Sequence, residues 1–125
     1  MSRAQPQLFS KGSVHAPYYV DGNLSLKRFA DFLGASQSDL AHIIGREART
    51  VDRDVPSKQV FERIKPLLYA MKLLLEIAEP KEIKRWLHEP LIEWRGKSPM
   101  DELMRGNIEG VVNLVERLYR GEGAY

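Results

Sequence analysis

The fold class of this chain is decided by residues 57–79, which read SKQVFERIKPLLYAMKLLLEIAE. Apolar side chains recur there at steps of three and four residues, the spacing that places them on one face of an α-helix. They are Phe61, Ile64, Leu67, Leu68, Met71, Leu74, Leu75 and Ala78. Pro66 interrupts the stretch, so the sequence predicts either one kinked helix or two helices that meet at Pro66.

Three shorter helices are predicted before this stretch. Ser25 can cap the first helix and Gly34 can end it, because glycine adopts positive φ without strain. Ser36 can cap the second, with Asp39 completing a capping-box pattern, and Gly45 can end it. The predicted inward residues are Leu26, Phe29, Phe32, Leu33, Leu40, Ile43 and Ile44. A third helix is predicted over residues 48–54.

Helices are also predicted after residue 79, on both sides of a loop at residues 88–97. Pro80 can begin the first of them, with Ile83, Trp86 and Leu87 inward. The stretch Ser98-Pro99-Met100-Asp101 is a strong helix start, because serine accepts from free amides and proline presets φ. Gly106 and Asn107 separate this helix from the last one, which Gly121 ends. That last helix is expected to bury Ile108, Val111, Val112, Leu114, Val115, Leu118 and Tyr119.

The predicted fold class is therefore all-α, since no segment shows the alternation of a strand. We expect residues 1–23 to form an arm without a helical repeat, either disordered or ordered by a partner, although Tyr18 and Tyr19 could dock on the body. Residues 24–79 are expected to form an N-terminal helical bundle with its connecting helix. Residues 80–125 are expected to form a helical C-terminal domain with a short tail.

Composition limits the classes of protein that this chain can be. Its 125 residues fit one compact domain, or two small helical subdomains that share a core. Cysteine is absent, which excludes disulfides, thiolate zinc sites and cysteine nucleophiles. The net charge of +2 neither demands nor excludes nucleic acid as a partner. No apolar run approaches the roughly 20 residues that span a bilayer, so we expect a cytoplasmic protein without a membrane partner.

The sequence contains none of the common catalytic motifs. The histidines are His15, His42 and His88, and His88-Glu89 lacks the second histidine of a zinc-protease motif. Neither a glycine-rich phosphate loop nor a Gly-x-Ser-x-Gly elbow is present. We therefore expect no enzymatic activity, no catalytic residues, no metal site and no cofactor.

Residues 37–54, which read QSDLAHIIGREARTVDRD, fit a helix-turn-helix. Ala41 is small enough for two helices to cross closely, Gly45 permits the sharp turn, and Val51 can anchor the second helix. In this motif the second helix enters the major groove of DNA, where arginine can donate hydrogen bonds to guanine or to phosphate. The candidate DNA-binding residues are Arg46, Arg49, Thr50 and Arg53.

A plain three-helix bundle remains the alternative interpretation of this segment. Arg46 and Asp54 stand where helix-turn-helix sequences are usually apolar. Asp52 and Asp54 would also repel phosphate, unlike the cationic surfaces that drive affinity for DNA. The sequence therefore predicts helix-turn-helix geometry more strongly than it predicts DNA binding.

The C-terminal half carries a set of residues in a fixed order: Trp86-Leu87-x-x-Pro90, Gly96-x-Ser98-Pro99-x-Asp101-x-Leu103, Gly106, Val111-Val112-x-Leu114, Gly121 and Tyr125. Through this set, residues 24–125 resemble the Xre/MbcA/ParS-type antitoxins. This set is similar to the toxin-binding domain of that family, and the helix-turn-helix before it matches in position and length.

The resemblance implies a partner and a way of acting. Such antitoxins bind a RES-domain toxin, which depletes cellular NAD, and their C-terminal segment blocks the toxin's NAD pocket. Their N-terminal domain can bind operator DNA, often as a homodimer. Arginine and aromatic residues are the usual anchors of protein interfaces. The candidate toxin-binding residues are Trp94, Arg117, Arg120, Gly121, Glu122, Gly123, Ala124 and Tyr125.

Two other functions stay open beside the antitoxin role. One is a helix-turn-helix repressor without a toxin partner, whose C-terminal domain serves dimerisation. The other is a helical adaptor for an unrelated protein, for which an exposed Trp94 would provide a contact.

Overall fold

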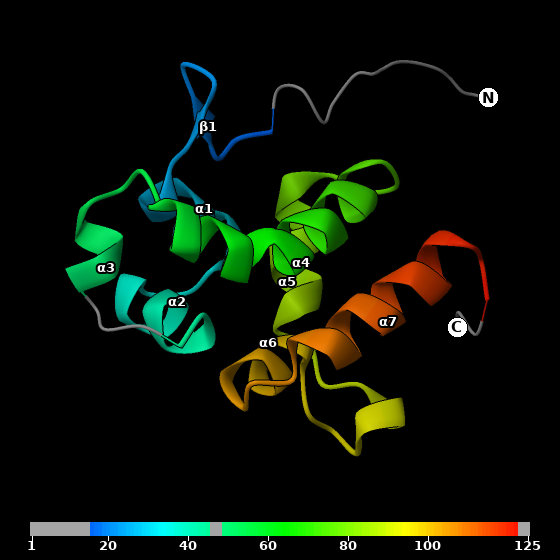
Figure 1. The fold of residues 1–125 in the computed structure, drawn as a ribbon. Helices are drawn as coiled ribbons and strands as arrows, with labels where there is room; N and C mark the ends of the chain where they lie inside the picture. The colour runs from blue at the N-terminus through cyan, green and yellow to red at the C-terminus, as the bar shows by residue number, and fades with distance from the viewer. Residues whose placement is uncertain (1–15, 46–48, 123–125) are drawn as a thin grey trace.

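The computed structural model describes residues 16–45 and 49–122 (Figure 1). Within those residues the chain forms seven α-helices, one short 3-10 helix and one small β-hairpin, so the all-α prediction is confirmed. The elements are β1 (Tyr19–Val20), β2 (Asn23–Leu24), α1 (Leu26–Leu33), α2 (Gln37–Ile43), α3 (Arg49–Asp52), α4 (Lys58–Leu75), α5 (Pro80–Leu87), η2 (Ile92–Trp94), α6 (Pro99–Met104) and α7 (Ile108–Tyr119).

Serine caps begin four of these helices. In each case the hydroxyl oxygen accepts a hydrogen bond from the backbone amide three residues later, which satisfies one free donor of the first turn. The pairs are Ser25 with Arg28, Ser36 with Asp39, Ser57 with Val60, and Ser98 with Asp101, at 2.9–3.2 Å. At α6 the bond is reciprocal, because the Asp101 carboxylate accepts from the Ser98 amide at 2.9 Å. In α2 the Ser36 hydroxyl accepts from the Asp39 amide, but the described residues do not show the reciprocal bond from the Ser36 amide to the Asp39 carboxylate.

Glycines end helices where the sequence predicted them to. Gly34 has φ +74 at the end of α1, and a Cβ there would lie 2.8 Å from Nε2 of His88. Glycine is therefore required at this position by both backbone conformation and close approach. Gly121 has φ +79 directly after α7.

The long stretch at residues 57–79 forms one continuous helix, α4, that passes through Pro66. Proline removes one backbone hydrogen bond from a helix interior. Here Ile64 and Leu67 are fully buried on either side of Pro66, so packing holds the helix together. The predicted third helix is shorter than expected, because Asp54 has φ +66 and the described helix covers only Arg49–Asp52.

The helices share one hydrophobic core that runs from Ala16 to Val115. Figure 1 shows α4 and α5 between the α1–α3 group and α7, and α4 and α7 pack closely together. The prediction of burial is wrong for two residues, because Phe61 is 36% exposed and Tyr119 is 41% exposed. Phe61 lines a groove and Tyr119 reaches Glu76 at the surface with its hydroxyl. The remaining predicted core residues are buried or half-buried, the half-buried ones being Leu75, Ala78, Trp86, Ile108, Val112 and Leu118.

The β-hairpin belongs to the body of the molecule. Tyr18, just before β1, is buried and meets Phe29 and Phe32 edge-on, with ring centroids 4.8 and 4.9 Å apart. The docking that the sequence left open for Tyr18 is therefore observed on α1, and Ala16 is buried as well, whereas residues 19–23 are exposed. Burial raises the pKa of the Tyr18 phenol. None of the helices in the described segments is long and apolar enough to cross a bilayer.

Candidate functional site

The end of α7 carries four of the predicted toxin-binding residues. Arg117 lies in the last turn, and Arg120, Gly121 and Glu122 follow directly. The helix closes through two backbone hydrogen bonds, from Gly121 to the Leu118 carbonyl at 3.0 Å and from Glu122 to the Arg117 carbonyl at 2.8 Å. The chain therefore leaves α7 in a defined direction. The remaining predicted tail residues, Gly123, Ala124 and Tyr125, lie outside the described residues.

Charges at this end are paired with one another. Nε of Arg120 donates to the Glu122 carboxylate at 3.0 Å, and this bond lowers the pKa of Glu122. Arg117 donates to the Glu93 carboxylate. Both pairs are at the surface, so a partner could exchange them for contacts of its own at little cost.

Two tyrosine–glutamate hydrogen bonds fix α7 beside α4. The Tyr69 hydroxyl donates to Oε2 of Glu116 at 2.8 Å, and the Tyr119 hydroxyl donates to Oε1 of Glu76 at 2.6 Å. Each carboxylate raises the pKa of the phenol that it binds. Beneath them α7 buries Val111, Leu114 and Val115. The end of α7 is therefore held firmly on the body of the protein.

Residues 88–97 are more ordered than the predicted loop. Leu91 and Lys97 form an antiparallel β-bridge, and η2 lies between them. Trp94 is half-buried against the core, so the freely exposed Trp94 considered from the sequence is not observed. The Glu93–Arg117 pair brings this segment, and with it the predicted residue Trp94, next to the end of α7.

Sequence reasoning missed Ile92, the first residue of η2. Its side chain is 98% exposed, more than any other large apolar side chain that the structure describes as exposed. A signal was present, since three apolar residues, Leu91, Ile92 and Trp94, lie in the short segment between Pro90 and Gly96. The sequence alone could not show which of Leu91, Ile92 and Trp94 points outward.

Of the predicted DNA-binding residues, Arg49 and Thr50 lie in α3 and Arg53 follows it directly. Ala41 and Val51 are buried as expected, and Gly45 has φ +72. Of the candidates, Arg53 is exposed and Thr50 is half-buried. Arg49 begins α3, but its side chain is not among the described ones, and Arg46 lies outside the described residues.

Asp54 has a structural role that the sequence did not predict. Its Oδ1 accepts from the Ser25 hydroxyl at 2.6 Å and from the Lys27 amide at 3.0 Å, at the start of α1. The Ser25 bond and then the Lys27 bond lower the pKa of this carboxyl. Asp54 therefore fastens the end of the α3 segment to α1 and stays ionised there. Asp52 remains exposed.

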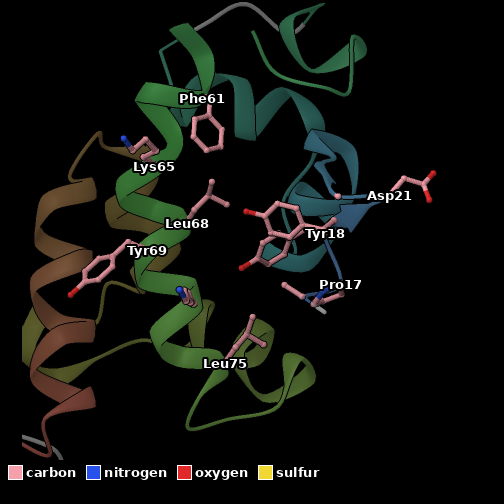
Figure 2. Close-up of a pocket in the computed structure, with 12 residues that line it drawn as sticks. Pro17, Tyr18, Asp21, Phe61, Lys65, Leu68, Tyr69 and Leu75 are labelled. Atoms are coloured by element: carbon pink, nitrogen blue, oxygen red, sulfur yellow. The ribbon is translucent and has the colours of Figure 1, made fainter. Parts of the chain in front are cut away.

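A groove of about 960 Å³ separates the β-hairpin from α4. Figure 2 shows Phe61, Leu68 and Leu75 along α4 facing Tyr18 across it, whereas Tyr69 points away. Lys65 and Lys72 also line it. None of the residues predicted to bind DNA or toxin is among its lining residues in the described chain.

No protein-family model matches this sequence, and no curated protein matches it. The fold is similar to that of one chain in the crystal structure of the M. tuberculosis MbcT-MbcA toxin-antitoxin complex. That match has a TM-score of 0.55 and 21% sequence identity, and it covers 77% of this chain and 91% of that chain. The two chains therefore share a fold over nearly the whole length of the matched chain.

Proposed function

We propose that this chain is an antitoxin that binds a RES-domain toxin and neutralises it by covering the toxin's NAD pocket. The observation that supports this most is the fold shared with a chain of a toxin–antitoxin complex. The motif residues from Trp86 to Gly121 supply the second support, because they lie on α5, α6 and α7 and on the segments that join and follow these helices. The protein acts in this proposal by binding and not by catalysis.

The geometry of α7 suits an occluding role. A helix that packs along α4 through Val111, Leu114 and Val115, with Tyr69 and Tyr119 bonding across the contact, spends little conformational entropy when a partner binds its end. Gly121 turns the chain out of the helix, so residues 122–125 can enter a cleft while Arg117 and Arg120 contact its rim. Inhibition by this route competes directly with NAD.

The test compares the full chain with a variant that lacks residues 122–125. The toxin that co-purifies with the tagged full chain from its native cells is isolated, and its NAD hydrolysis is measured against increasing amounts of each form. We expect the truncated form to inhibit far less, while its circular dichroism spectrum and melting temperature stay unchanged. Arg53→Ala is the control and should inhibit fully. Full inhibition by the truncated form would contradict occlusion by the tail.

We further propose that the α2–α3 segment binds operator DNA as a homodimer and so represses the chain's own operon. The supporting observation is the packing of Ala41 and Val51 around the Gly45 turn, with Arg53 exposed beside it. Arg49→Ala and Arg53→Ala should each weaken binding to DNA from upstream of the gene, and each should lower the salt dependence by about one unit of slope. Arg120→Ala, at the other end of the molecule, is the control. DNA binding that does not depend on salt concentration would contradict this proposed function.

A further inference from the structure

Ile92 stands out from every other exposed apolar side chain of the described residues. It is 98% exposed, whereas the others, such as Val55 and Ile77, are 36–53% exposed. Single exposed apolar residues are common on proteins and need no explanation by themselves. What sets Ile92 apart is the rigid segment that carries it and the place of that segment beside α7.

Backbone hydrogen bonds hold the segment around Ile92 in one shape. Leu91 donates to the Lys97 carbonyl at 3.1 Å, Gly96 donates to the Leu91 carbonyl at 2.8 Å, and Lys97 donates to the Trp94 carbonyl at 3.0 Å. The Trp94 side chain packs against the core and anchors the segment from within. Ile92 is therefore exposed on a segment that is already ordered. Little conformational entropy is lost when a partner buries it.

The segment is continuous with the end of α7. Glu93, the neighbour of Ile92, is paired with Arg117, and the Arg117 carbonyl accepts the amide of Glu122, where the tail begins. A stable interface buries about 800 Å² on each partner, which corresponds to 20–30 residues. An interface of that size that contains Arg117 and Arg120 is large enough to reach η2, because Glu93 contacts Arg117.

We propose that Ile92 is an anchor of the toxin interface, which inserts into an apolar pocket on the toxin beside the cleft that receives the tail. This inference rests on the proposed antitoxin function and adds a second contact to it. The tail blocks the toxin's site, and Ile92 contributes affinity. The partner's pocket must be apolar because the isoleucine side chain offers no polar group, and burying it strengthens binding by the hydrophobic effect.

The experiment measures the dissociation constant of the co-purified toxin for the full chain and its variants by isothermal titration calorimetry. We expect Ile92→Ala to weaken binding about tenfold and Ile92→Asp about a hundredfold, from the area lost and the charge introduced. Val55→Asp is the matched control, since Val55 is an exposed apolar residue between α3 and α4, and its affinity should stay within twofold of the parent's. Melting temperatures verify that each variant is folded.

Two results would count against the proposal, and they are distinguishable. If the parent binds the toxin but Ile92→Asp binds as well as Val55→Asp does, Ile92 is not an anchor and the antitoxin function stands. If the parent itself binds no RES-domain toxin, the proposed function fails and the anchor fails with it.

Discussion

The α1–α3 region and the α7 region pack on one apolar core but differ in the polar contacts that join them to the rest of the molecule. The helices α1, α2 and α3 have eight, seven and four residues, and polar side chains join their ends to neighbouring segments. Asp54 binds the start of α1, the His88 ring binds the carbonyl of Leu33, and the His42 ring binds the carbonyl of Met104, both at 3.0 Å. Helix α7 has twelve residues and packs along α4.

This difference shows how one small core can support two surfaces with different properties. Helices α1 and α2 bury apolar side chains such as Phe29 and Leu40, and long-range polar contacts in addition fix the ends of these helices, where a single substitution removes them. A long helix packed along another depends on apolar burial, and its polar contacts only refine its position. The surface around Arg53 belongs to the first kind, and the surface around Arg117 belongs to the second.

The largest expected effect comes from breaking the core that the two regions share. Leu40 in α2 and Leu103 in α6 are both fully buried in one continuous cluster. Leu40→Ala and Leu103→Ala should each lower the free energy of unfolding by about 2–5 kcal/mol, because each leaves a cavity. Urea unfolding followed by circular dichroism measures both.

The two tryptophans make this comparison sharper. Trp86 and Trp94 both lie in the C-terminal half, so their fluorescence reports unfolding there. If the chain unfolds as one unit, Leu40→Ala shifts the fluorescence transition as much as it shifts the dichroism transition. If Leu40→Ala leaves the fluorescence transition unmoved, the two regions unfold independently, as two subdomains would.

A smaller effect is expected at Asp54, which tests the role of polar contacts in the α1–α3 region. Asp54→Ala removes the acceptor for Ser25 and Lys27 and places alanine at φ +66. We expect a loss of about 2 kcal/mol in unfolding free energy. Asp52→Ala is the matched control, because Asp52 is exposed in the preceding turn, and it should change stability by less than about 0.5 kcal/mol.

The contribution of Asp54 should depend on pH in one direction. Its pKa is lowered in the folded protein, first by the Ser25 hydroxyl and then by the Lys27 amide. The folded state therefore favours the carboxylate, and this stabilisation is present above the ordinary aspartate pKa of 3.8 and is lost as pH falls through the lowered value. The stability difference between the parent and Asp54→Asn should shrink on acidification below pH 4. A difference that stays constant would show that the charge of Asp54 is unimportant.

Local signals in the sequence predicted the helix boundaries well. Ser25, Ser36, Ser57 and Ser98 are caps in the structure because a serine oxygen needs only the amide three residues ahead, a contact within one turn. The apolar periodicity likewise predicted most of the core. Such signals are readable because both the donor and the acceptor lie close together in the chain.

Contacts between distant residues could not be predicted in the same way. Asp54 looked like a surface carboxylate because its partner Ser25 is 29 residues away. Ile92 looked like part of a loop because its exposure depends on Trp94 turning inward and on the pairing of Leu91 with Lys97. In both cases the side chain's role is set by tertiary structure, and a local pattern carries no information about it.

The smallest expected effect is at Tyr119, where the comparison predicts that a polar contact only refines the position of α7. Tyr119→Phe removes the hydrogen bond to Glu76 but keeps the ring, and Tyr119 is 41% exposed. The loss in unfolding free energy should be about 0.5 kcal/mol, at the low end for a hydrogen bond because water can replace it. A double-mutant cycle with Glu76→Gln measures the coupling.

The Tyr119 contact should also respond to alkali. Because the Glu76 carboxylate raises the pKa of the phenol in the folded protein, the stabilisation is present below the ordinary tyrosine pKa of 10.0 and is lost as pH rises through the raised value. The difference between the parent and Tyr119→Phe should therefore persist at pH 9 and shrink only above pH 10, as the phenol ionises. If Tyr119→Phe instead cost as much as Leu103→Ala, α7 would depend on its polar contacts just as α1–α3 does, and the contrast between the two regions would fail.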